Sequence, residues 1–289
     1  MTLRAVITGW TENERLNFLV TNRIPRRILT RFMGWFSKIE LAPIRHPSIA
    51  IFRAVCAPNL AEAKKQSFRS LHDCFIRELA AGARSIDPRQ NVLISPCDGI
   101  VGAAGAIRGN TLMQVKGFAY TLEELLREPA LAARYHNGSY VTLRLTAGMY
   151  HRFHAPDRCR ARRVTHIPGD AWNVNPPALK RIDRLYCRNE RAVLSLELAG
   201  ERGTLTLVAV AAVLVAGIRL RFLSLPFERN SPVPTAISCD ATFEKGEELG
   251  WFEHGSTILV LAPAGFELTQ NVSEGALIQM GEPLLVAPG

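Results

Sequence analysis

The sequence predicts an α+β protein: a β-rich body of curved, largely antiparallel sheets, preceded by N-terminal amphipathic helices. Three observations support this prediction. Before residue 80, apolar residues recur at helical spacing, whereas after it short runs of Val, Leu, Ile and Thr alternate with Gly and Pro. The longest apolar run, 205–218, has 14 residues, fewer than the roughly 20 that a membrane-spanning helix needs. We expect it to form one or two strands buried on both faces.

The first predicted helix covers residues 25–39 and has an apolar and a basic side. Its apolar residues lie at largely helical spacing, and its cations fall mostly between them. The apolar residues are Ile28, Leu29, Phe32, Met33, Trp35, Phe36 and Ile39, and the cations are Arg26, Arg27, Arg31 and Lys38. Such a helix suits an anionic membrane interface, with apolar side chains at the acyl boundary and cations beside the head groups. The alternative is a surface helix packed on its own domain.

Formal charge is concentrated in the same part of the chain. The whole sequence has a formal net charge of +9. Residues 1–70 contain 12 Lys and Arg against 4 Glu, which leaves +8 there and almost none in the other 219 residues. A basic segment confined to amphipathic helices favours an anionic membrane surface, and not nucleic acid, as the partner.

The remaining elements follow from local patterns. A second helix is expected over 59–79, with Phe68, Leu71 and Phe75 on its apolar stripe. One short helix is expected after Thr121, a good N-cap with Glu124 three residues later. Strands are expected within "NVLISPCDGIVGAAGAI", "SYVTLRLT", "RAVLSLEL", "GTLTLVAVAAVLVAGI" and "STILVLAP". The six cysteines form no CxxC pair and follow no secretory signal, so we expect reduced cytoplasmic thiols without disulfide or metal roles.

The dipeptide Gly255-Ser256 stands directly before a strand-forming run, and two interpretations are open. It is not a nucleophile elbow, because His254 and Ile258 occupy the two glycine positions of G-x-S-x-G. It could be an ordinary strand-entry turn. Alternatively, the serine hydroxyl attacks the preceding carbonyl, and β-elimination of the resulting ester leaves dehydroalanine, which hydrolyses to a pyruvoyl group. Glycine favours that attack because it lacks an obstructing Cβ.

Self-attack needs a base for the hydroxyl proton, and a histidine oriented by a carboxylate is the usual choice. "MYHRFHAP" supplies His151 and His154, and "SPCDGIVG" supplies Asp98 in a turn. Each has an ordinary alternative, because H-x-x-H is a weak metal signal and Asp-Gly is a common turn. With Ser256, Asp98 and a histidine form a set of the kind that activates a hydroxyl.

Longer motifs extend these observations. "SPCDG", "QVKGFAYTLEELL", "YHRFHAP", "IPGDAWNVN", "FEKGEELGWFEHGST" and "MGEPLL" follow one another in an order and at a spacing that resemble the phosphatidylserine decarboxylases. The front, "LNFLVTNRIPRRILTRFMGWFSKIE", is similar to that of the bacterial members. The similarity covers most of the chain. It departs at His254, where many members have Leu or Gly, and at Ala211 and Ala216, where relatives often have glycine.

The resemblance implies a self-cleaving, pyruvoyl-dependent enzyme. Cleavage between Gly255 and Ser256 would leave a β chain (1–255) and an α chain (256–289). Ser256 would become the pyruvoyl group that forms a Schiff base with phosphatidylserine, His154 would be the base, Asp98 would orient it, and His151 would serve decarboxylation to phosphatidylethanolamine. The covalent pyruvoyl group would be the cofactor, with no metal and no pyridoxal phosphate.

The resemblance also sets expectations for organisation and partners. Residues 1–58 would be a basic amphipathic helical membrane-association region, and 59–289 the decarboxylase domain with its β-rich catalytic body. The partners would be phosphatidylserine and the anionic surface on the cytoplasmic side of the cell membrane, bound peripherally. The two chains would form a heterodimer, able to pair into a dimer of heterodimers. The alternatives are a pyruvoyl-dependent decarboxylase of another serine-headgroup lipid or a soluble amino acid, and a non-enzymatic membrane-associated homologue.

Overall fold

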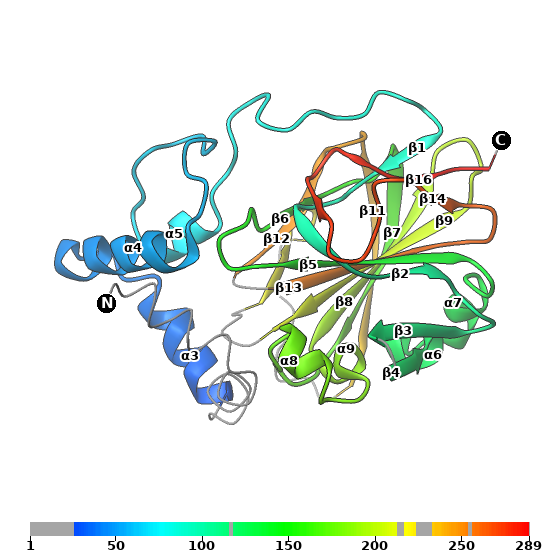
Figure 1. Cartoon of the computed structure of the whole chain (residues 1–289), viewed down its shortest axis with the longest axis horizontal. Coiled ribbons are helices and arrows are strands. Elements are labelled where there is room, and N and C mark those ends of the chain that lie inside the picture. The colour runs from blue at the N-terminus through cyan, green and yellow to red at the C-terminus, as the bar shows by residue number, and fades with distance from the viewer. Residues whose placement is uncertain (1–25, 116–117, 213–216, 224–232, 254–255, 289) are drawn as a thin grey trace.

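A computed structural model describes residues 26–115, 118–212, 217–223, 233–253 and 256–288. Helices at one end of the molecule adjoin a large body of β-sheets, and Figure 1 shows the helices in blue beside the sheets. The expected α+β class, with largely antiparallel sheets preceded by helices, is confirmed. The first part of the predicted membrane-association region, 1–25, lies outside the described residues.

The largest sheet has eight strands, and each is antiparallel to its neighbours. In spatial order they are β11 (Thr235–Phe243), β7 (Cys159–Ile167), β8 (Arg191–Leu198), β9 (Thr204–Ala211), β13 (Ser256–Ala262), β5 (Ser139–Leu145), β2 (Gly99–Ala106) and β15 (Leu277–Ile278). Strand β13 lies between β9 and β5, and all seven of its residues are buried. The sequence expectation that Ser256 begins a buried strand is therefore confirmed.

Smaller sheets and short helices complete the body. One three-stranded sheet has the order β1 (Val92–Ile94), β16 (Pro283–Val286) and β14 (Glu267–Leu268). A second three-stranded sheet has the order β10 (Ile218–Leu220), β12 (Glu248–Phe252) and β6 (Arg152–His154). In a third sheet, β3 (Thr111–Val115) pairs with β4 (Phe118–Thr121). The short helices are α6 (Leu122–Leu126), α7 (Pro129–Ala133), α8 (Pro176–Leu179) and α9 (Leu185–Arg188). Helix α6 begins with the capping box expected from Thr121 and Glu124.

The front of the described chain has three helices, α3 (Arg26–Phe36), α4 (Ala42–Cys56) and α5 (Leu71–Phe75). A small apolar cluster, distinct from the main core of the β body, joins α4 and α5 to the segment between them. Helix α3 leaves large apolar side chains in solvent: Ile28 is 68%, Phe32 50% and Trp35 63% exposed. This exposure favours the membrane interpretation of α3 over a helix packed on its own domain.

The expected helix over 59–79 is wrong, because only Leu71–Phe75 is helical there. Ser70 begins α5 by accepting a hydrogen bond from the Asp73 N–H. Before it, Ala63 forms an isolated antiparallel bridge with Leu79, and Lys64 bonds to Glu78. The apolar stripe is real, since Phe68 and Phe75 are both buried, but a folded loop buries it in place of a continuous helix.

Candidate active site

Ser256 lies at the centre of the large sheet, at the end of the strands that faces the helices. It is the first residue of β13 and pairs with Leu145 on one side and with Ala211 on the other. The residue is fully buried, and its Oγ has no hydrogen-bond partner in the part of the chain that the structure describes. A buried hydroxyl without a partner carries a cost, of roughly 1–3 kcal/mol, which marks the position as one that needs explaining.

A cavity of about 450 Å³ borders Ser256, and it lies between the helices and the β body. The helical side of its lining is apolar: Met33, Phe52, Leu71 and Phe75. The β body contributes most of the polar lining residues: Arg144, Thr146, Asn173 and Asn175. Asn173 and Asn175 belong to the "IPGDAWNVN" segment, so this segment forms part of the cavity that contains Ser256. The cavity can hold an apolar group next to a small polar one.

His154, on β6, is held by two hydrogen bonds. Its Nδ1 lies 2.9 Å from the Gly246 carbonyl, so Nδ1 carries the proton, and its Nε2 lies 3.0 Å from the Tyr150 hydroxyl, which therefore donates to it. Burial lowers the pKa of His154, against the opposing effects of the Gly246 carbonyl and nearby carboxylates. The ring is thus neutral at pH 7, with its basic nitrogen directed to Tyr150.

Asp98 lies in the turn before β2 and is engaged by an arginine. Its carboxylate accepts two bonds from Arg84, at 3.0 and 2.6 Å, and one from the Met280 N–H at 3.0 Å. No hydrogen bond joins Asp98 to His154 in the described structure, although the Pro96 carbonyl accepts from the His154 N–H at 2.8 Å. The two loops expected to cooperate are therefore adjacent, while their side chains bond to other groups.

A second, smaller cavity of about 240 Å³ adjoins the cavity that borders Ser256. Asp98 and Tyr150 both line it, and it shares Cys56 and Thr146 with the cavity that borders Ser256. His151 lies beside the larger cavity: its ring centroid is 4.0 Å from that of Phe75, which lines it. The His151 Nδ1 lies 2.9 Å from the Met149 carbonyl, so its basic nitrogen is Nε2. Ser256 therefore lines the larger cavity and Asp98 the smaller one, while His151 contacts Phe75 of the larger lining and His154 bonds to Tyr150 of the smaller lining.

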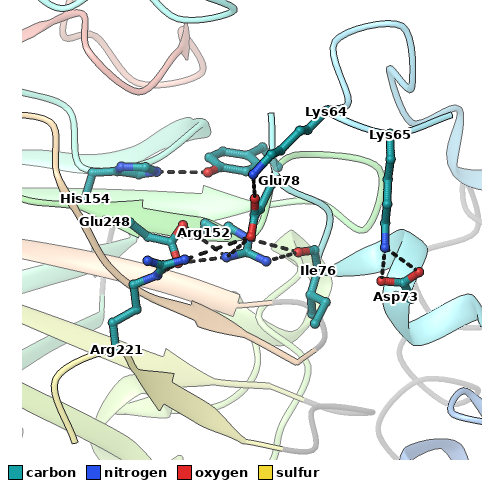
Figure 2. Close-up of polar contacts among 10 residues, drawn as sticks. Lys64, Lys65, Asp73, Ile76, Glu78, Arg152, His154, Arg221 and Glu248 are labelled. Carbon is teal, nitrogen blue, oxygen red and sulfur yellow. Dashed lines mark hydrogen bonds and ion pairs between the residues drawn. The ribbon is translucent and has the colours of Figure 1, made fainter. Parts of the chain in front are cut away.

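The arginine between the two histidines fixes their strand. Figure 2 shows Arg152 between Glu248 and the Ile76 carbonyl, with Arg221 on the other side of Glu248. The Arg152 Nη1 lies 2.8 Å from Glu248 Oε1, and its Nε lies 2.9 Å from the Ile76 oxygen. Because Ile76 directly follows α5 and Glu248 lies on β12, the Arg152 side chain links β6 to β12 and to the helical front. The sequence shows Arg152 only as the arginine of "YHRFH" and does not indicate these partners.

Comparison with known proteins shows the family of this chain. The family model described as phosphatidylserine decarboxylase matches residues 71–286. Two relatives, each called phosphatidylserine decarboxylase proenzyme, are 32% identical: that of Haemophilus influenzae over 94% of this chain and 96% of its own length, and that of Anaeromyxobacter sp. over 94% and 98%. The proenzyme of Alcanivorax borkumensis is 33% identical over 89% of this chain and 91% of its own. The chain belongs to the phosphatidylserine decarboxylase family.

This member of the phosphatidylserine decarboxylase family carries a charged cluster that its sequence did not reveal. Glu253, three residues before Ser256, is buried and lies near two cations, Lys38 at 3.7 Å and Arg219 at 3.4 Å, and near the His72 ring at 3.7 Å. Burial alone would raise the pKa of Glu253, but the His72 hydrogen bond and the two cations outweigh it and lower this pKa to about 2. The cluster anchors the segment that leads into Ser256 against the helical front.

Three residues singled out in the sequence are not among those that the structure describes. His254, Gly255 and Ala216 lie outside the described residues, whereas Ala211 pairs directly with Ser256. Within the described ranges, no group of three or more His, Cys, Asp or Glu side chains could hold a metal ion. No helix in the same ranges is long and apolar enough to cross a membrane.

Proposed function

We propose that this chain decarboxylates phosphatidylserine to phosphatidylethanolamine, using a pyruvoyl group that it makes from Ser256 by cutting its own 255–256 bond. The observation that carries the proposal is the buried Ser256 hydroxyl, which lies at the edge of a largely apolar cavity and has no hydrogen-bond partner among the described residues. The relatives' name, proenzyme, supports a chain that must be processed before it acts.

The self-cleavage step assigns roles to three residues. Ser256 Oγ attacks the carbonyl carbon of residue 255 and forms an ester, and the C–N bond between residues 255 and 256 breaks so that the nitrogen leaves as an amine. His154 would accept the hydroxyl proton at Nε2, which is unprotonated because burial lowers the pKa of the ring, once the Tyr150 hydroxyl that donates to this nitrogen has moved aside. Asp98 raises the pKa of the same ring through its charge, an effect that stabilises the imidazolium formed during the attack. Elimination of the ester then releases residue 255 as a carboxylate and leaves dehydroalanine at residue 256, which reacts with water to give the pyruvoyl group and ammonia.

Decarboxylation would use the same cavity. The pyruvoyl group, once formed, supplies an electron sink for the electron pair left by CO2. The apolar lining from the helices excludes water and disfavours a carboxylate charge, which promotes loss of CO2. His151, behind Phe75, would hold a proton at Nε2 for the carbon that loses CO2.

The helical front would bring the enzyme to its substrate. Ile28, Phe32 and Trp35 are exposed on α3, and Leu41 and Ile51 are exposed beside or on α4, among the cations of this basic segment. Apolar side chains mixed with cations suit peripheral binding to the anionic, cytoplasmic face of the cell membrane. We retain 1–58 as the membrane-association region and 59–289 as the decarboxylase domain, acting as a heterodimer of the 1–255 and 256–289 chains that can pair into a dimer of heterodimers.

The experiment is a vesicle assay with a mass measurement. Purified wild-type protein should contain two chains and release CO2 from phosphatidylserine vesicles, while Ser256→Ala should stay at full length and release none. A folded wild-type chain that is cut but inactive on phosphatidylserine would contradict the proposal that phosphatidylserine is the substrate. A folded chain that is never cut would contradict the mechanism.

A further inference from the structure

Arg144 has an unusual setting in the cavity that borders Ser256. It is the only charged residue in the described lining of this cavity, which contains no carboxylate. It lies on β5 next to Leu145, the residue that pairs with Ser256. A single cation is therefore placed beside the reactive serine in surroundings that are otherwise apolar or neutral.

The Arg144 guanidinium also lacks the partners that the other buried arginines have. Arg84 meets Asp98 and Glu62, and Arg152 meets Glu248. Arg191 donates to four backbone carbonyls, those of Glu124, Leu125, Cys187 and Asn189. No hydrogen bond or ion pair from the Arg144 side chain reaches any residue that the structure describes, and burial lowers the pKa of this guanidinium. A half-buried cation without a counter-charge is costly, and an anionic ligand would relieve that cost.

We propose that Arg144 binds the phosphodiester of the lipid substrate, an inference that rests on the proposed function. A guanidinium donates two parallel hydrogen bonds to a phosphate, and this geometry makes arginine well suited to phosphate binding. In the head group of phosphatidylserine the amine and the phosphate are only a few bonds apart, which matches a cation and a serine that line the same cavity. The acyl chains would then lie toward Met33, Phe52, Leu71 and Phe75.

The substrate carries a second anion, its carboxylate, and physical reasoning favours the phosphate as the partner. The phosphodiester keeps its charge throughout the reaction, so binding it stabilises ground state and transition state alike. A cation on the carboxylate would stabilise the group that must lose its charge as CO2, and this would raise the barrier. Arg144 is therefore assigned to binding and specificity, separate from the proton-transfer roles of His151 and His154.

The test compares two water-soluble substrates that differ in the phosphate. Dihexanoyl phosphatidylserine has it, and O-decylserine has the same amine and carboxylate without it. For Arg144→Gln we expect kcat/KM on dihexanoyl phosphatidylserine to fall by about 10- to 100-fold, mostly through KM, while kcat/KM on O-decylserine stays within about twofold. Arg144→Lys should recover part of the loss. Arg163→Gln, which removes an exposed cation paired with Glu128, is the matched control and should change neither substrate.

Two results would overturn the assignment: an equal fall on both substrates, which would point to the carboxylate or to folding, or no fall on either. Mass analysis of Arg144→Gln should show normal chains, because the residue is not part of the cleavage step. Binding to the uncut Ser256→Ala protein gives a reading that does not depend on activity. Calorimetry with dihexanoyl phosphatidylethanolamine should show affinity in Ser256→Ala and a loss of about tenfold or more when Arg144→Gln is added. If wild-type protein fails on both substrates, the proposed function fails, and this binding measurement still decides the phosphate site.

Discussion

The two sides of the candidate active site differ in how their polar groups are satisfied. On the base side, His154 is bonded through both ring nitrogens and Asp98 through both oxygens. On the serine side, the Ser256 hydroxyl is buried without a partner among the described residues, next to an apolar cavity. The contrast teaches that hydrogen bonds fix the tautomer of the proposed base and burial keeps it neutral, while the proposed nucleophile has no hydrogen-bond partner among the described residues. The predictions below test each half of this contrast.

The largest effect is expected from removing the base. His154→Ala should accumulate full-length precursor, with the cleavage rate lower by about 100-fold or more, because the Ser256 proton loses its acceptor. Gel analysis of freshly synthesised protein over time measures this rate, and circular dichroism checks the fold. Cleavage at the normal rate in a folded His154→Ala protein would remove this residue from the base side.

The second histidine should separate the two reactions. His151→Ala should cut itself normally but decarboxylate about 100-fold more slowly, because it lies beside Phe75 and serves the later proton transfer. The measurements are chain masses and the rate of CO2 release from phosphatidylserine vesicles by the same preparation. Equal losses in cleavage and decarboxylation would show that the two histidines act as a unit.

Asp98→Asn should slow cleavage by about 10-fold, since the turn is retained while the negative charge that favours the protonated His154 is lost. Arg84 loses an ion pair in this variant, so folding needs a control. Arg84→Gln removes the same pair from the other end and keeps the Asp98 charge. If Arg84→Gln slowed cleavage as much as Asp98→Asn, the effect would come from the ion pair and not from the charge near His154.

Tyr150→Phe should have the smallest effect and the clearest pH dependence. The Tyr150 hydroxyl donates to the neutral form of His154, so its loss should raise the pKa of that ring. Cleavage needs the neutral ring, and its rate therefore falls as pH drops through this pKa. In Tyr150→Phe that fall should begin at higher pH, with the rate at pH 8 changed by only a few-fold. An unchanged pH profile would show that the hydrogen bond does not control the base.

The parts of this protein that depend on local sequence could be predicted. The capping box at Thr121 and the buried strand after Ser256 both follow from the types and spacing of adjacent residues. The helix over 59–79 was mispredicted because the spacing of Phe68 and Phe75 suits a helix, whereas bonds such as Lys64–Glu78 favour a loop. The spacing of apolar residues along the sequence does not indicate contacts between residues as far apart as Lys64 and Glu78.

The candidate site shows the same division. Its members could be named from motifs, because Asp98, His151, His154 and Ser256 stand in recognisable stretches. Their partners could not, since Arg84 reaches Asp98 and Glu253 gathers Lys38, His72 and Arg219 only after distant segments fold together. The isolation of Arg144 is likewise visible only when the cavity around it is known.

The most direct test of the central claim is the intact mass of the purified protein, measured beside that of Ser256→Ala. Wild-type protein should give two chains, 1–255 and 256–289, and the mass of the smaller chain should correspond to a pyruvoyl group in place of its N-terminal serine. Ser256→Ala should give one chain of 289 residues. A single unbroken wild-type chain, folded and indistinguishable from Ser256→Ala, would contradict the account.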